Sequence, residues 1–223
     1  MAKLFLLRHL KSQWNLDDRF AGWIDNPLSK EGADEAKAVA TGFAGQKFDV
    51  VYTSPLIRNM QTVIKILRNL GDKYPLFIHL DGGQMHKWQN FTDISENDLP
   101  TYVSEKLNER YYGKLQGLNK EETIKKYGEE LVHQWRRSYT IAPPGGESEK
   151  DVYKRAAPFY KKYIEKDLKE GKDVLVVASH NSLRAIVKYV ENISDEKIID
   201  LELPFGSLTK YEFDGKNYIK YNK

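Results

Sequence analysis

Two histidines each come directly after a short apolar run of the sequence. His9 follows Leu4–Leu7 and Arg8, and His180 lies just past the run Val174–Ala178. Such runs are too short for helices and predict strands buried on both faces. Ligands of open α/β sheets collect beyond the carboxyl ends of these strands, so the sequence predicts a site containing both imidazoles and a guanidinium. A histidine that closes a strand is also commonly a hydrogen-bonded residue at the sheet edge with no catalytic role. For His9, the rest of the chain decides between a catalytic and a structural role.

The N-terminal half predicts alternating helices and strands. Residues 15–26 indicate a loop, Ser29 can cap a helix that ends near Gly45, and 48–52 predict a second strand. Ser54 and Pro55 then open a helix that stops before Gly71, which places Arg58 about one turn beyond a strand end. Its inward face is predicted to hold Leu56, Met60, Ile64 and Leu67.

The pattern weakens between residues 73 and 106, where we expect a short strand followed by an irregular excursion with a turn at 97–100. His79, Asp81 and His86 fall here and make a metal site conceivable. No helical or strand spacing brings these three together, which favours an ordinary polar loop.

The C-terminal half predicts a short helix from Asn119 to Gly128 and a long helix from Ser148 to about Glu170, kinked at Pro158. After the second buried strand, Ser182 is expected to open a helix over 183–190. Ser194 caps another short helix, and 208–213 pairs with 218–221 across a turn. We therefore expect one α/β domain over residues 1–223, a three-layer sandwich with a mostly parallel central sheet flanked by helices.

Composition narrows the function. The 223 residues carry a net charge of +3, and acidic and basic residues are interleaved along the chain. This pattern differs from the continuous basic surface that binds nucleic acids, and it favours a small anionic ligand. The chain has no cysteine, which excludes disulfides, thiolate metal sites and cysteine nucleophiles. It also lacks an apolar run of membrane-spanning length, and its N-terminus enters the first strand at once without room for a signal peptide, so we expect a cytoplasmic protein.

Several short segments of the sequence match the motifs of one known protein family. They are Leu7-Arg8-His9 with 12–15, Arg19-Phe20 with Gly22-Trp23, 52–54 with Arg58, 107–112, 115–120, 134–137 and 181–188. On these blocks the chain resembles the cofactor-dependent phosphoglycerate mutases of the histidine phosphatase superfamily over nearly its whole length. The run Leu-Asn-Glu-Arg with Gly-x-Leu-Gln-Gly-Leu-Asn-Lys is specific to the mutase branch.

The resemblance implies a phosphoglycerate mutase-like fold, 2,3-bisphosphoglycerate as phosphoryl primer, no metal and a possible homodimer. It implies that His9 is transiently phosphorylated, that Glu109 moves the proton, that His180 is the partner imidazole, and that Arg8 and Arg58 hold the phosphoryl group. The residues implied to bind substrate are Ser12, Asn15, Gly22, Arg110, Tyr112, Lys120, Arg136, Arg137 and Asn181.

These residue types suit phosphoryl transfer. A neutral His9 is a good nucleophile if its other ring nitrogen donates, most simply to a backbone carbonyl. Arginines and a protonated His180 would place positive charge around the transferred group. Glu109 must switch protonation state, and we expect burial and a nearby phosphate to raise its pKa.

Three departures from the family pattern bear on activity. Leu10 and Lys11 stand where the family usually has glycine and glutamate, and a Leu10 forced to positive φ would cost about 1–3 kcal/mol. The glycine that usually follows the second histidine is missing before Asn181, which could displace His180 by about 3.8 Å. Residues 73–106 are longer than expected, and 143–147 are short.

Three functions follow from these observations. The first is interconversion of 3-phosphoglycerate and 2-phosphoglycerate, favoured because the cations Arg110, Lys120, Arg136 and Arg137 could retain a doubly phosphorylated acid. The second is a phosphatase on the same scaffold, in which water accepts the phosphoryl group. The third is a catalytically impaired relative that binds phosphorylated ligands or a protein partner.

Overall fold

The protein is described by a computed structural model that covers residues 1–43, 45–71, 73–89, 91 and 93–221. Within these residues one seven-stranded sheet has the order β3-β4-β2-β5-β1-β6-β7. The strands are β1 (Ala2–Arg8), β2 (Val50–Thr53), β3 (Tyr74–His79), β4 (Asp98–Val103), β5 (Val174–Ala178), β6 (Leu208–Phe213) and β7 (Tyr218–Tyr221).

The sheet is mostly parallel, as predicted. β1 to β5 run parallel to one another, and the predicted hairpin of β6 and β7 adds an antiparallel edge beside β1. The carboxyl ends of β1 and β5 lie side by side because Arg8 is in register with Ala178. The parallel strands of this sheet therefore bring the residues after β1 and the residues after β5 to one place.

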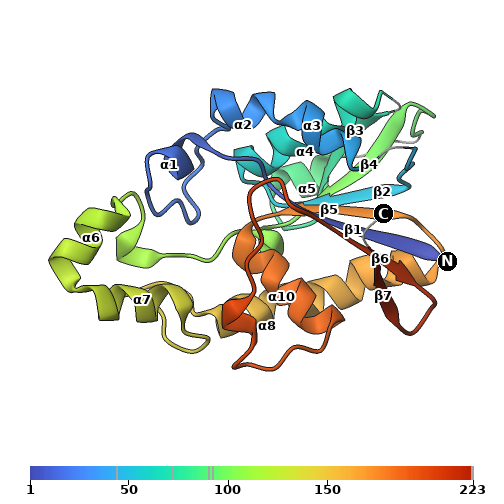
Figure 1. Cartoon of the computed structure of the whole chain (residues 1–223). Coiled ribbons are helices and arrows are strands. Elements are labelled where there is room, and N and C mark those ends of the chain that lie inside the picture. Colours follow the sequence, from blue (N-terminus) through green and yellow to red (C-terminus); the bar gives the residue numbers. More distant parts are fainter. Residues whose placement is uncertain (44, 72, 90, 92, 222–223) are drawn as a thin grey trace.

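Helices cover both faces of the sheet (Figure 1). They are α1 (Gln13–Leu16), α2 (Lys30–Asp34), α3 (Ala36–Thr41), α4 (Ile57–Leu70), α5 (Gln84–Trp88), α6 (Lys120–Tyr127), α7 (Glu129–Arg137), α8 (Glu149–Phe159), α9 (Glu165–Lys169) and α10 (His180–Val190). Side-chain alternation along β1 explains the two layers: Leu4 and Leu6 pack with α8 and α10, whereas Phe5 and Leu7 pack with α3 and α4. Helices α6 and α7 lie away from the sheet and pack on Phe20.

Four details of the sequence prediction change. The predicted inward face of α4 is only partly right. Leu56 and Leu67 are buried, but Ile64 is 43% exposed, and Asn59, Thr62, Val63 and Ile66 are also buried. Asn59 and Thr62 are buried because they hydrogen-bond Ser179 and the backbone N–H of Leu10. The helix after β5 starts at His180 with Ser179 as its N-cap, three residues before the expected start at Leu183. Ser194 precedes a 3-10 turn, η4 (Ile198–Asp200), instead of a short α-helix.

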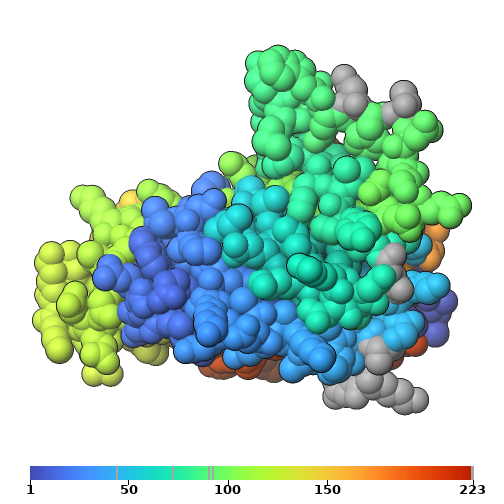
Figure 2. Space-filling view, turned by 90° about the horizontal axis from the view of Figure 1, so that it is seen from above, coloured from blue at the N-terminus to red at the C-terminus, as the bar shows by residue number. Residues whose placement is uncertain are grey.

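The fourth change is in residues 73–106, which are more regular than expected. β3 is followed by α5 and then by β4. β4 was not predicted, because its first residues fall in the turn expected at 97–100. Figure 2 shows the segment around α5 projecting from the body of the molecule. Residues 90 and 92 of this predicted excursion lie outside the described residues.

The long helix after Ser148 forms as predicted, with a π-turn, η3 (Tyr160–Ile164), directly after Pro158-Phe159. A proline in a helix interior removes a backbone donor, and the irregular turn follows at that point. In the described part of the chain no helix combines the length and the apolarity that a membrane span requires.

Candidate active site

The carboxyl ends of β1 and β5 open into a cavity of about 230 Å³. His9 and His180 both line it, and the backbone N–H of His9 donates to the carbonyl of Ala178 at 3.0 Å. This bond ties the residue after β1 to the last residue of β5. The predicted meeting of the two histidines at neighbouring strand ends is therefore confirmed.

Twelve of the fourteen residues predicted for the site line this cavity. They are Arg8, His9, Asn15, Gly22, Arg58, Glu109, Tyr112, Lys120, Arg136, Arg137, His180 and Asn181.

The other two, Ser12 and Arg110, do not line the cavity. Ser12 is fully buried, and its hydroxyl donates to Asn15 at 2.7 Å, so it positions a lining residue. Arg110 lies behind the wall, where it donates to the carbonyl of Arg136 at 3.1 Å and stacks on the ring of Tyr112.

His9 is arranged as a neutral imidazole. It is 2% exposed, and its Nδ1 atom lies 2.7 Å from the carbonyl oxygen of Leu10. Because a carbonyl only accepts, Nδ1 carries the proton and the lone pair is on Nε2. Burial, with the positive charges of Arg58 and Arg8, lowers the pKa of His9 well below its usual value.

Two guanidinium groups flank His9. Arg58 is 1% exposed and donates to the carbonyls of Gly22 at 2.7 Å and Ile24 at 3.0 Å. Arg8 donates to the carbonyl of Leu203, and its guanidinium lies 3.7 Å from the ring centre of Phe205. Burial lowers the pKa of Arg8 to about 10, so it stays charged at neutral pH. Each arginine keeps a buried Nε atom without a protein partner.

Glu109 is held as a carboxylate. Its Oε1 atom accepts from the backbone N–H of Arg110 at 2.6 Å and from the side-chain amide of Asn181 at 2.7 Å. Burial acts to raise its pKa, but His180, these hydrogen bonds and Arg8 together lower it below the usual value. The expected raised pKa is therefore wrong for the protein in this state, because these two donors, the backbone N–H of Asn181 and two basic side chains together outweigh desolvation.

His180 opens α10 and directs Nε2 toward Glu202 Oε2, 3.4 Å away. Burial lowers its pKa below the usual value, although the hydrogen bond to Glu202 acts in the opposite direction. The protonated His180 expected from the sequence does not agree with this direction. The missing glycine does not remove His180 from the site, since the ring still lines the cavity.

Leu10 fits its position without backbone strain. Its φ is not among the positive values of the described residues, and its side chain is fully buried in the core with Phe5 and Leu7. It does not line the cavity. The cost expected from a leucine at a glycine position is therefore wrong.

The predicted alternative of a metal site between β3 and α5 receives no support from its side chains. His86 hydrogen-bonds the carbonyl of His79 at 2.8 Å, and Asp81 accepts from Ser104 at 2.9 Å. Across the residues with described positions, no group of three or more His, Cys, Asp or Glu is arranged to hold a metal ion.

The sequence prediction missed six lining residues: Arg19, Phe20, Ala21, Arg184, Glu202 and Phe205. The first four lie in or next to the blocks that carry the resemblance. Glu202 and Phe205 lie between η4 and β6, where no motif or periodicity marks them. They belong to the site because Phe205 contacts Arg8 and Glu202 contacts His180, and both partners come from other segments of the chain.

Comparison with known proteins agrees with this geometry. The model of the histidine phosphatase superfamily (branch 1) matches residues 4–95 and 88–221. Two proteins named 2,3-bisphosphoglycerate-dependent phosphoglycerate mutase are similar over most of their length. The one from Methanococcus vannielii is 46% identical over 97% of this chain and 92% of its own, and the one from Gloeothece citriformis is 44% identical over 96% and 95%.

Solved structures agree on the fold. A mycobacterial glucosyl-3-phosphoglycerate phosphatase superposes with a TM-score of 0.76 at 23% identity, covering 99% of this chain and 98% of its own. The α-ribazole phosphatase from Shigella flexneri gives 0.75 at 18% identity over 98% and 94%. The chain therefore belongs to the histidine phosphatase superfamily and, within it, to the family of 2,3-bisphosphoglycerate-dependent phosphoglycerate mutases.

Proposed function

We propose that this chain interconverts 3-phosphoglycerate and 2-phosphoglycerate by passing a phosphoryl group through His9. The observation that carries the proposal is the state of His9, a neutral imidazole fixed by the Leu10 carbonyl between Arg8 and Arg58. Relatives that are 46% and 44% identical carry the mutase name, which supports this reaction over others of the superfamily.

The cavity fits a small acid with two phosphate groups. Its lining includes seven guanidinium or ammonium groups against two carboxylates, and the buried Nε atoms of Arg8 and Arg58 have no hydrogen-bond partner within the protein. 2,3-Bisphosphoglycerate, when bound, supplies the phosphoryl group that loads His9. Arg8 and Arg58 stabilise the negative charge on the transferred oxygens and need no metal to do so.

Nε2 of His9 and the carboxylate of Glu109 share the transfer. When the hydroxyl oxygen of a monophosphoglycerate bonds to phosphorus, the N–P bond breaks and its electron pair returns to Nε2. Glu109 takes the hydroxyl proton in this step and returns it when the reaction runs in reverse, which suits its ionised resting state. Asn181 and the backbone N–H of Arg110 keep the carboxylate in place.

Retention of the intermediate separates a mutase from a phosphatase. We assign Lys120, Arg136 and Arg137 on the cavity wall to the carboxylate and the phosphate that is not transferred. Charged hydrogen bonds of about 1.5–3 kcal/mol each would hold the doubly phosphorylated acid while it turns round. In a phosphatase, water would take the phosphoryl group from His9 instead.

The test is to incubate the protein with labelled 2,3-bisphosphoglycerate, measure acid-labile label on His9, and then add 3-phosphoglycerate. Rapid formation of 2-phosphoglycerate with little free phosphate supports the mutase. Dominant phosphate release indicates a phosphatase, and no label indicates a binding protein. His9→Gln must abolish the label, whereas His86→Gln, on the exposed α5, must leave it unchanged.

A further inference from the structure

Glu202 places a second carboxylate at a cavity that is otherwise built for anions. Of the described residues that line the cavity, Glu109 and Glu202 are the carboxylates. Glu109 is buried and held by backbone and amide donors, whereas the side chain of Glu202 is 54% exposed. The two carboxylates therefore differ in how freely they can move.

The contacts of Glu202 are those that an anionic ligand would make. Its Oε1 atom accepts from Nη1 of Arg137, and its Oε2 atom lies 3.4 Å from Nε2 of His180. Hydrogen bonding to His180 and then to Arg137 lowers the pKa of Glu202 to about 2, against the opposing effect of burial. The side chain is therefore a full negative charge at neutral pH.

The backbone around Glu202 is anchored independently of this side chain. The carbonyl of Leu203 accepts from Arg8, the carbonyl of Ile198 accepts from Arg184, and the ring of Phe205 stacks on Arg8. Three fixed points before and after Glu202 hold the segment on the cavity wall. The half-exposed side chain can turn toward solvent while the segment stays in place.

We propose that Glu202 is an internal counter-anion that competes with the carboxylate or phosphate of the ligand for Arg137 and His180, and so sets the affinity of the cavity for anionic substrates. The inference rests on the proposed function, because it takes this cavity as the ligand site. A residue that only supported the site would act in the opposite direction, since its removal would weaken ligand binding.

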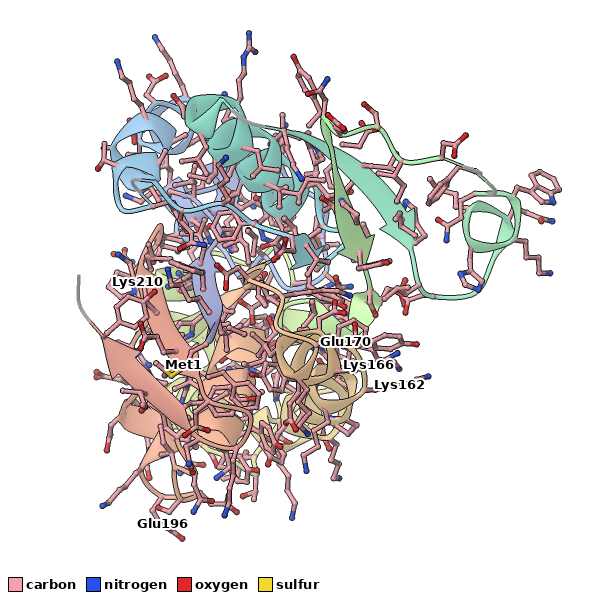
Figure 3. The ribbon with its side chains drawn as sticks, turned by 90° about the vertical axis from the view of Figure 1, so that its right-hand side faces the viewer. Met1, Lys162, Lys166, Glu170, Glu196 and Lys210 are labelled. Carbon is pink, nitrogen blue, oxygen red and sulfur yellow. The ribbon has the colours of Figure 1, made fainter. Side chains whose placement is uncertain are left out.

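The experiment measures binding of inorganic phosphate and of 3-phosphoglycerate to the whole protein by calorimetry. Glu202→Gln removes the charge, and Glu196→Gln is the matched control, because it changes net charge equally at an exposed position at the edge of the molecule (Figure 3). We expect Glu202→Gln to lower the Kd for phosphate about 3- to 10-fold, as for the loss of a partly exposed competing ion pair, and Glu196→Gln to leave it unchanged.

Arg137→Gln tests the partner. In that background the gain from Glu202→Gln is expected to shrink to less than about half, because part of the competition no longer has its target. Glu202→Ser must change phosphate affinity in the same direction as Glu202→Gln, and the thermal unfolding midpoint of each variant identifies any misfolded protein.

Unchanged or weaker phosphate binding in both folded Glu202 variants overturns the inference. A wild-type protein that does not bind 3-phosphoglycerate defeats the proposed function, and the phosphate measurement then still decides the role of Glu202. If the wild type binds 3-phosphoglycerate and both Glu202 variants match it, only the counter-anion is refuted.

Discussion

The Nδ1 atom of His9 and the carbonyl oxygen of Leu10 lie 2.7 Å apart, so the residue after the nucleophile fixes its tautomer through the main chain. This contact uses no side-chain atom of Leu10, whose isobutyl group lies in the core. A leucine can therefore occupy this position without disturbing the imidazole.

The first prediction concerns the protonation of His9. Its folded-state pKa is lowered well below 6.5, so the ring stays neutral as the pH falls from 7 through 6 and gains its proton only at lower pH. Nitrogen-15 NMR of the imidazole should show the Nδ1–H tautomer unchanged across this range, with His9→Gln identifying the signal. Titration of His9 at 6.5 or above would contradict the structure.

Replacement of Glu109 by Gln tests the proton transfer. Glutamine keeps an oxygen for the donors on Arg110 and Asn181 but cannot take the proton of a hydroxyl. We expect kcat for isomer exchange to fall about 10²- to 10⁴-fold with little change in the thermal unfolding midpoint. A loss below about tenfold would mean that another group moves the proton.

Gly22 permits the close packing that presents its carbonyl to Arg58. Its φ is +49°, and a Cβ atom there would lie 2.2 Å from Oε1 of Gln116. Gly71→Ala is the control, since Gly71 has φ +80° but open space around it. We expect Gly71→Ala to lower the free energy of unfolding by about 1–2 kcal/mol, from backbone strain alone.

Gly22→Ala should cost about 1 kcal/mol more, because Oε1 of Gln116 must move and give up its hydrogen bond from the backbone N–H of Trp23. We also expect slower labelling of His9, since the adjoining Gly22 carbonyl accepts from Arg58. Urea unfolding and the labelling rate are the two measurements. Equal unfolding free energies for the two variants would show that the contact with Gln116 is not tight in solution.

Arg184, which lines the cavity, forms a buried ion pair with Glu149. Their Nη1 and Oε2 atoms are 3.7 Å apart, and the two residues are 1% and 2% exposed. Arg184→Met leaves the Glu149 carboxylate buried without its cation and is expected to lower the free energy of unfolding by about 3–5 kcal/mol.

Adding Glu149→Gln to Arg184→Met should recover part of that loss, because the buried charge is removed as well. Urea unfolding of both variants checks this. A loss below about 1 kcal/mol for Arg184→Met would indicate that water reaches the pair.

The sequence predicted those parts of the fold that local patterns encode. The buried strands that end at Arg8 and Ala178 are continuous apolar runs, and their ends carry His9 and His180. β4 was not predicted from the sequence, because Asp98-Leu99-Pro100 has the composition of a turn. In the sheet, pairing with β2 begins only at Thr101, so Pro100 precedes that ladder.

The electrostatic state of the site could not be predicted from local patterns. The ionised state of Glu109 depends on Asn181 and Arg8, and the proton affinity of His180 depends on Glu202. These partners come from separate segments that meet only after the sheet has formed. The prediction that residues 1–223 form one domain remains a prediction.

The place of β1 between β5 and β6 has a consequence for synthesis of the chain. β1 is synthesised well before its pairing partners at residues 174–178 and 208–213. Until then the apolar residues of β1 lack their native neighbours and stay exposed on the nascent chain. Both neighbours of β1 are therefore available only after residue 213 has been synthesised, and the site at its carboxyl end cannot form earlier.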